Sequence, residues 1–170
     1  MNLVKGLLIG VMALVAIPAS AEPVQWSSAE TSLGTVTAEF PCSEEAVQVL
    51  ERDGLEAIRC DSSGLVDFLF VLPAKMLSRF GFPGSSIEDL RKNIEADEAT
   101  EYLIDTSISG FAGFYSEGRA GSGKVALGIV DIRDGRYVML NVQSDGSDEA
   151  EKAISEVFVR SWGSLQVVKP

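Results

Sequence analysis

The chain has 170 residues, with 14 lysines and arginines against 25 aspartates and glutamates, two cysteines and no histidine. Without histidine, a Ser-His-Asp or Cys-His catalytic pair and every histidine metal ligand are excluded. The formal net charge of −11 disfavours nucleic acid and anionic lipid surfaces as partners, because their phosphates would be repelled. The length fits one domain.

The N-terminal segment has the three parts of a secretory signal peptide. Lys5 supplies the positive start, residues 7–17 form an uncharged apolar core, and Ala19-Ser20-Ala21 offers small residues before a cleavage site. The apolar run is shorter than the ~20 residues that a membrane-spanning helix needs. No cysteine for lipidation stands at the cleavage point. We therefore expect a signal peptide over residues 1–21 and a periplasmic or secreted protein that does not span the membrane.

Export gives the two cysteines a specific interpretation. In an oxidising compartment an even number of cysteines predicts a disulfide, and Cys42 and Cys60 allow one intramolecular pair. The bridge would close a loop of about 18 residues and contribute on the order of 3 kcal/mol to stability. A redox-active pair is the alternative, but the C-x-x-C spacing typical of such pairs is absent. The sequence favours a structural bridge, between strands that we expect to be neighbours in one sheet.

The first half of the mature chain carries mainly strand signals. Residues 22–34 are rich in Ser, Thr and Glu and are expected to be a lead-in segment to a single domain over residues 35–170. Alternating apolar residues predict strands at residues 35–40, 46–50, 55–60 and 65–72. The last of these is apolar on both faces except at Asp67, which is typical of a central strand covered by a helix.

The second half adds a helix to further strands. Ser85-Ser86-Ile87-Glu88 fits a capping box and predicts a helix over residues 85–96. The glycines of residues 110–113 are expected to break the chain after a strand at residues 102–108. Further strands are expected at residues 125–132 and 137–142, joined by an Asp134-Gly135 hairpin turn.

A long helix is predicted near the C-terminus. The acidic residues Asp145, Asp148 and Glu149 complement the positive end of a helix dipole, and Gly163 is expected to end the helix. Its predicted buried stripe comprises Ala150, Ile154, Val157, Phe158 and Trp162. Strands with two helices among them predict the α+β class: a single domain with an antiparallel β-sheet and helices packed on it.

Two patterns could carry ligand chemistry. Residues 118–125, GRAGSGKV, match part of a phosphate-binding P-loop, but a strand rather than a helix is predicted to follow, which favours a glycine-rich hairpin. Two acidic runs could collect a cation or serve as paired carboxylates of a hydrolase. They are Glu95, Asp97, Glu98 and Glu101, and Asp145, Asp148, Glu149 and Glu151. Neither run has an ordered set of metal ligands, so no catalytic residue, metal site or cofactor is predicted.

The connection at residues 75–84 is unusually rich in large apolar side chains. Met76, Leu77, Phe80 and Phe82 lie between the predicted strand at 65–72 and the capped helix. If exposed, these four side chains would form a partner-binding patch. Alternatively, they fold back to cap the core, which is the more common fate of such residues.

The order of elements resembles the PsbP-like superfamily, which includes photosystem extrinsic subunits, the Ran-binding Mog protein and DcrB-type bacterial secreted proteins. The resemblance covers roughly residues 34–165. It rests on residues 36–41 (VTAEFP), Gly110 to Gly113, residues 134–137 (DGRY), Phe158 and Ser161-Trp162. It implies an antiparallel sheet between helices and a binding or accessory role. No functional residue of the family carries over.

We therefore expect an exported, non-enzymatic accessory protein that binds another protein or a component of the cell envelope. A carboxylate-based hydrolase and a small-ligand or cation-binding protein are the alternatives. A structure discriminates among them, because converging carboxylates in a deep pocket would favour an enzyme and an open sheet face would favour a binding protein.

Overall fold

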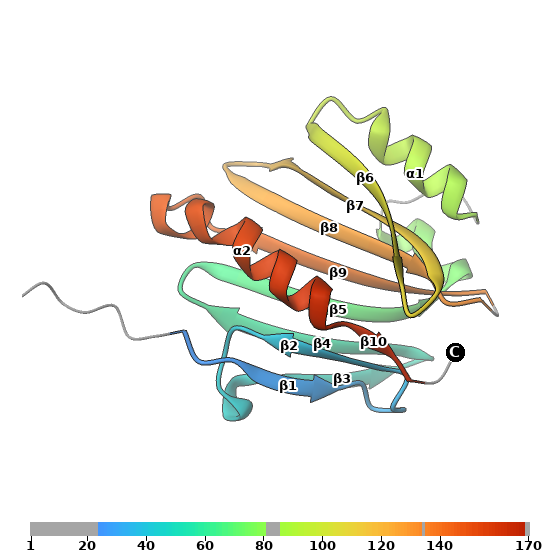
Figure 1. The fold of residues 1–170 in the computed structure, drawn as a ribbon, viewed down its shortest axis with the longest axis horizontal. Helices are drawn as coiled ribbons and strands as arrows, with labels where there is room; N and C mark the ends of the chain where they lie inside the picture. The colour runs from blue at the N-terminus through green and yellow to red at the C-terminus, as the bar shows by residue number, and fades with distance from the viewer. Residues whose placement is uncertain (1–23, 81–85, 134, 169–170) are drawn as a thin grey trace, which may run out of the picture.

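The computed structural model describes residues 24–80, 86–133 and 135–168, so the expected signal peptide lies outside the described residues. Over these ranges the strands form two antiparallel sheets, with the order β3-β4-β5-β9-β8-β7-β6 in the large sheet and β1-β2-β10 in the small one (Figure 1). The large sheet comprises β3 (Gln48–Arg52), β4 (Leu55–Ser62), β5 (Leu65–Pro73), β6 (Thr100–Ile108), β7 (Phe111–Ala120), β8 (Gly123–Asp131) and β9 (Arg136–Ser144). The small sheet comprises β1 (Ser27–Glu30), β2 (Val36–Phe40) and β10 (Gln166–Val167).

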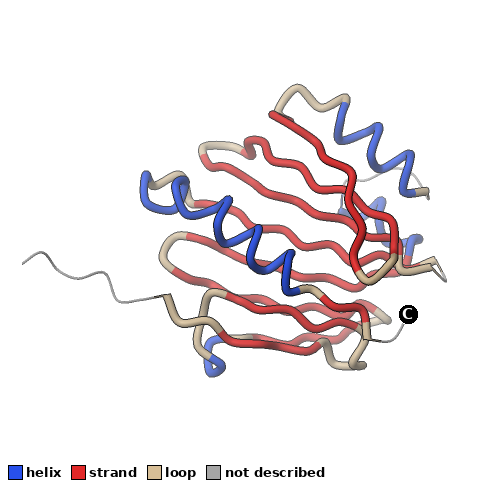
Figure 2. The backbone as a smooth tube through the Cα atoms, in the orientation of Figure 1, coloured by secondary structure: helices blue, strands red, loops and turns tan. Residues whose placement is uncertain are grey.

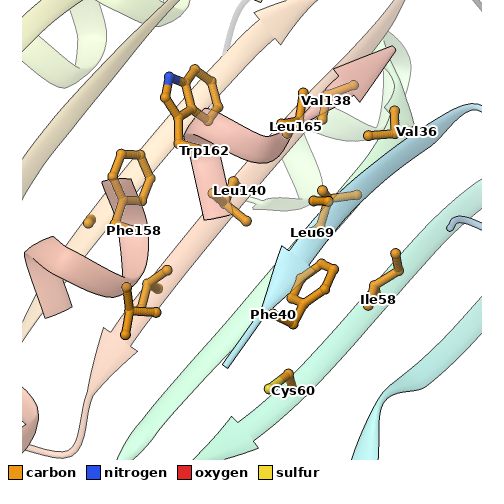
Figure 3. Packing of buried hydrophobic residues seen from close by; sticks show 14 of the residues in the cluster. Val36, Phe40, Ile58, Cys60, Leu69, Val138, Leu140, Phe158, Trp162 and Leu165 are labelled. Carbon is orange, nitrogen blue, oxygen red and sulfur yellow. The ribbon is translucent and has the colours of Figure 1, made fainter. Parts of the chain in front are cut away.

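Helix α2 (Asp148–Ser164) and the small sheet cover one face of the large sheet, as the tube in Figure 2 shows. Phe158 and Trp162 of α2 stack on each other at 5.7 Å between ring centroids. Figure 3 shows them over Leu140, with Phe40 of the small sheet packed beside Leu69. All five residues of the predicted α2 stripe are buried, which confirms the stripe.

The opposite face of the large sheet carries a second core. Helix α1 (Ile87–Glu95) and the 3-10 helix η2 (Ala74–Phe80) pack there against alternate residues of the strands. Leu72 and Met139 belong to this second core, whereas their chain neighbours Val71 and Val138 belong to the first. A shorter 3-10 helix, η1 (Glu44–Ala46), connects the small sheet to β3. The α+β class, the antiparallel sheet and the single domain are therefore as predicted.

Several expected element boundaries are wrong. Residues 46–50 were expected as a strand, but η1 occupies the start and β3 begins only at Gln48. The N-cap of α1 is Ser86, whose hydroxyl accepts a hydrogen bond from the backbone N–H of Asp89. The sequence pattern predicted the pair Ser85 and Glu88, so the observed capping pair lies one residue further along the chain. Helix α2 continues through Gly163 to Ser164. Within the expected lead-in at 22–34, the structure places strand β1.

The largest omission from the sequence prediction is β7, where glycines were expected to break the chain. Gly113 and Gly118 instead lie inside this strand. A Cβ atom at Gly113 would overlap the backbone carbonyl oxygen of Ile129, and one at Gly118 would overlap that of Ala99, so only glycine fits at these two positions. The glycines mark close backbone approach rather than a strand end. Residues 118–125 are the predicted hairpin, joining β7 to β8.

The disulfide joins the two sheets. Cys42 follows β2 in the small sheet and Cys60 lies in β4 of the large sheet, with 6.2 Å between the two Cα atoms. The expectation that the bridged strands are neighbours in one sheet is therefore wrong. A second tie lies at the other end of β4, where the buried carboxylate of Glu56 accepts from the Thr35 hydroxyl at 2.8 Å and the Leu33 backbone N–H at 3.1 Å.

The contact between α2 and β8 predicts opposite outcomes for two glycine substitutions. The Trp162 ring lies directly against Gly128, so a Cβ atom there overlaps the ring, whereas nothing lies within 4 Å of a Cβ atom at Gly163. We expect Gly128→Ala to lower the free energy of unfolding by about 2 kcal/mol. Gly163→Ala should be neutral or stabilising by up to about 1 kcal/mol, since alanine is the better helix former. Urea unfolding of both variants measures this, and a Gly128→Ala protein as stable as the wild type would contradict the packing described.

Candidate binding surface

The part of the predicted partner-binding loop that the structure describes contributes to the core. Leu77 is fully buried and Met76 is half-buried against the second core, so these two do not form an exposed patch. The side chain of Phe80 and all of Phe82 lie outside what the structure describes. For Met76 and Leu77 the alternative interpretation, capping of the core, therefore holds.

One residue of each acidic run accepts a local backbone hydrogen bond in the turn beside a helix. Asp97 accepts from the backbone N–H of Ala99 at 2.9 Å, and Asp145 accepts from that of Ser147 at 2.8 Å. The hydrogen bond from Ser147 lowers the pKa of Asp145. Among the described residues, no group of three or more carboxylate or cysteine side chains could hold a metal ion.

A broad part of the second face of the large sheet is left uncovered by α1 and η2. The register aligns five residues in one row across β4, β5, β9, β8 and β7: Arg59, Phe68, Asn141, Leu127 and Ser116. We call the exposed and half-exposed part of this region the open face. It comprises Leu50, Arg59, Asp61, Val66, Phe68, Asn141 and Gln143, none of which is buried.

A stack of three side chains, Arg59, Phe68 and Phe70, lies at the centre of the open face. The Arg59 guanidinium lies 5.2 Å from the centre of the Phe68 ring, and the Phe68 and Phe70 rings stack at 5.5 Å. Arg59 also donates two hydrogen bonds to Asp61, at 2.9 and 2.7 Å, which raise the pKa of Arg59. Because Arg59 and Asp61 neutralise each other, the centre presents apolar surface and hydrogen-bonding groups without net charge.

Next to this stack lies a hollow with an unpaired polar group. The Oδ1 atom of Asn141 is buried and has no hydrogen-bond partner. It borders a cavity of about 250 Å³ beside the C-terminal end of α1, lined among others by Ser116, Leu127 and Gln143. A buried amide oxygen without a partner carries a free-energy penalty.

Sequence reasoning missed the open face because it expected β5 to be a central strand with both faces apolar and a helix over at least one of them. The alternation of Val66, Phe68 and Phe70 was visible, but the same alternation is found in strands covered by a helix. In the structure, the side bearing Asp67 is the fully buried one and the phenylalanine side is half-exposed. The only available signal was the pairing of Arg59 with Asp61 on the neighbouring strand, two charges that a covered sheet face would disfavour.

The architecture is an α+β sandwich with helices on both faces of one antiparallel sheet. No family model and no curated protein matches the chain. Among solved structures, the Ran-binding protein Mog1p of Saccharomyces cerevisiae is similar, with a TM-score of 0.52 and 9% identity over 86% of this chain and 97% of that one. LpqN of Mycobacterium tuberculosis, described as involved in cell envelope biogenesis, has a TM-score of 0.45 and 13% identity over 84% of this chain and 90% of that one.

These likenesses concern the fold. The expected fold, an antiparallel sheet between helices, is the one observed, and Mog1p is similar to it. The described residues include no helix that is both long and apolar enough to cross a membrane.

Proposed function

We propose that this protein is an exported, non-enzymatic binding protein that captures a protein partner on the open face. The observation that carries the proposal is the uncovered stretch of sheet around Phe68, with the neutral Arg59–Asp61 pair at its centre. Interface cores combine aromatic and arginine side chains in this way, with little net charge. Leu50, 55% exposed on the edge strand β3, extends the apolar surface.

The shape of the surface supports a protein partner over a small molecule. The cavity beside Asn141 has about 250 Å³, below the roughly 300–1,000 Å³ of typical ligand pockets. The open face also extends from β3 to β9, which is wider than a small ligand would contact. Mog1p is described as a Ran-binding protein, so one protein of this fold has a protein partner.

Export is supported by the signal-like residues 1–21 together with the disulfide between Cys42 and Cys60. Disulfides persist in oxidising compartments and are rare in the cytosol. We therefore place the binding event in the periplasm or outside the cell, after cleavage following Ala21.

Site-specific photo-crosslinking tests the proposal. A photo-reactive residue replaces Leu50 or Gln143 on the open face, and Val159, which is 61% exposed on α2 at the other side of the sheet, serves as the control. In intact cells that produce the protein, both open-face positions should give an adduct with the same protein, and Val159 should not. Equal adducts from Val159, or none from either open-face position, would refute the proposal.

A further inference from the structure

Asp67 is a buried carboxyl group that the binding function does not use. Its side chain is 0% exposed, lies between β5 and α2, and receives one hydrogen bond, from the Ser161 hydroxyl to Oδ2 at 3.0 Å. Its Oδ1 atom has no hydrogen-bond partner. Burial raises the pKa of Asp67 to about 7, and the hydrogen bond from Ser161 opposes this in part.

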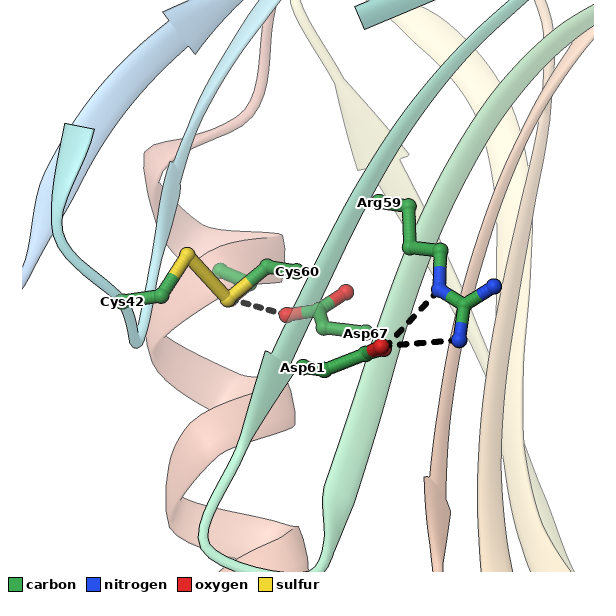
Figure 4. The surroundings of a disulfide bond; sticks show 6 residues. Cys42, Arg59, Cys60, Asp61 and Asp67 are labelled. Carbon is green, nitrogen blue, oxygen red and sulfur yellow. Dashed lines mark hydrogen bonds and ion pairs between the residues drawn. A yellow bond between two sulfur atoms is a disulfide. The ribbon is translucent and has the colours of Figure 1, made fainter. Parts of the chain in front are cut away.

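The carboxyl group lies beside the disulfide. Asp67 is the cross-strand partner of Cys60 in the pairing of β4 with β5. Figure 4 shows Cys60 between Cys42 and the carboxyl group of Asp67, which points toward the Cys60 sulfur. Cys60 is 0% exposed, whereas Cys42 keeps 6% exposure. Both cysteines belong to the first core, and Cys42 is the one nearer the surface, so a reagent that reached the bridge would meet Cys42 first and Cys60 would be the leaving sulfur beside Asp67.

We infer that the Cys42–Cys60 bridge is a thiol–disulfide exchange site, attacked at Cys42 by an external dithiol, with Asp67 as the internal acid that protonates the leaving sulfur of Cys60. A thiolate released in this apolar position would be poorly solvated, so an adjacent proton donor lowers the barrier. In the reverse direction, the Asp67 carboxylate accepts the proton of the Cys60 thiol as the bridge forms.

The step balances as follows. The thiolate of the dithiol bonds to the sulfur of Cys42, the S–S bond breaks, and its electron pair goes to the sulfur of Cys60, which takes the proton of Asp67. The second thiolate of the dithiol then attacks the first dithiol sulfur, which is bonded to Cys42 in the mixed disulfide. This releases the Cys42 thiolate, which is protonated by water. The dithiol is oxidised to a cyclic disulfide, both cysteines are reduced to thiols, and Asp67 recovers its proton from solvent.

The charged groups on the elements around Asp67 are engaged elsewhere. Glu39 of β2 pairs with Arg160 of α2 at 2.8 Å, and Glu56 of β4 accepts its hydrogen bonds from the turn before β2. Strand β9 places Val142 opposite Asp67. In the part of the chain that the structure describes, burial raises the pKa of Asp67 and the hydrogen bond from Ser161 lowers it.

Exchange at this site would change how the two sheets are held together. The disulfide ties the small sheet to the large one at Cys60, and Glu56 ties them at the other end of β4. Opening the bridge releases the first tie and leaves the second, so the small sheet can separate at one end while the rest of the fold persists.

The test is the rate of reduction of the folded, oxidised protein by dithiothreitol between pH 5 and pH 9, expressed per reductant thiolate and measured by mass after alkylation. For the wild type we expect this rate constant to fall at least about tenfold as the pH passes about 7, because Asp67 loses its proton. Asp67→Asn should be at least about tenfold slower than the wild type at pH 6 and independent of pH.

Ser161→Ala provides the matched variant, since it keeps the carboxyl group and removes its hydrogen bond. The falling profile should persist with its midpoint at higher pH, because the hydrogen bond favours the charged form. Coinciding profiles for wild type and Asp67→Asn would overturn the inference. A wild-type rate constant that does not change between pH 5 and pH 9 would overturn it as well, and this outcome can be read from the wild-type protein alone.

Discussion

Raising the pH from 4 to 8 should destabilise the wild-type protein by roughly 4 kcal/mol more than it destabilises an Asp67→Asn variant. The pKa of Asp67 is raised from 3.8 in the unfolded chain to about 7 in the folded protein. The folded state therefore holds a proton that the unfolded state has already lost. This contribution to stability is fully present below about pH 3.8 and is lost as the pH rises through about 7.

Urea unfolding at a series of pH values, with the disulfide intact, measures the effect. The other carboxylates titrate in both proteins, so the difference between the two stability curves isolates Asp67. The wild-type curve should fall relative to that of the variant and then level off above about pH 7. Parallel curves would show that the Asp67 carboxyl is not buried as described.

Replacing both Cys42 and Cys60 by serine should lower the free energy of unfolding by roughly 2–5 kcal/mol. The bridge closes a loop with a sequence separation of 18, and it connects a strand of the small sheet to one of the large sheet. Its loss frees the unfolded chain from this constraint, and the Glu56 contacts keep the sheets in register in the folded state.

The same urea titration at one fixed pH gives this number, and far-ultraviolet circular dichroism checks that the fold survives. Wild-type protein whose bridge has been reduced and alkylated serves as a comparison with an unchanged sequence. A loss of less than about 1 kcal/mol in the double variant would contradict the role given to the bridge.

The elements with a regular pattern were predictable from the sequence. The stripe of α2 from Ala150 to Trp162 has helical spacing and faces one apolar surface, so its burial follows directly. The glycine hairpin at residues 118–125 follows in the same way from local turn chemistry. The disulfide pair also follows, because the chain offers one combination of cysteines.

Features that depend on distant pairing were not predictable. The small sheet combines β1 and β2 with β10. Strand β10 lies near the C-terminus and pairs with β2 near the N-terminus, Gln166 opposite Thr37. Strand β7 was not predicted because its glycines resemble a strand break in the sequence. They are required by the close approach of the Ile129 and Ala99 backbones, and no local sequence pattern indicates that approach. The open face depends on which side of β5 receives α2, and Asp67, the polar exception in that strand, lies on the buried side.

The most direct measurement compares two charge reversals that are matched in their surroundings. Arg59 pairs with Asp61 over the Phe68 ring on the open face, and Arg160 pairs with Glu39 over the Trp26 ring on the other side of the sheet. In Arg59→Glu, the yield of the crosslink from a photo-reactive residue at Gln143 should fall by more than about tenfold. In Arg160→Glu the yield should stay at the wild-type level. Equal yields from the two variants would show that the open face does not bind the partner.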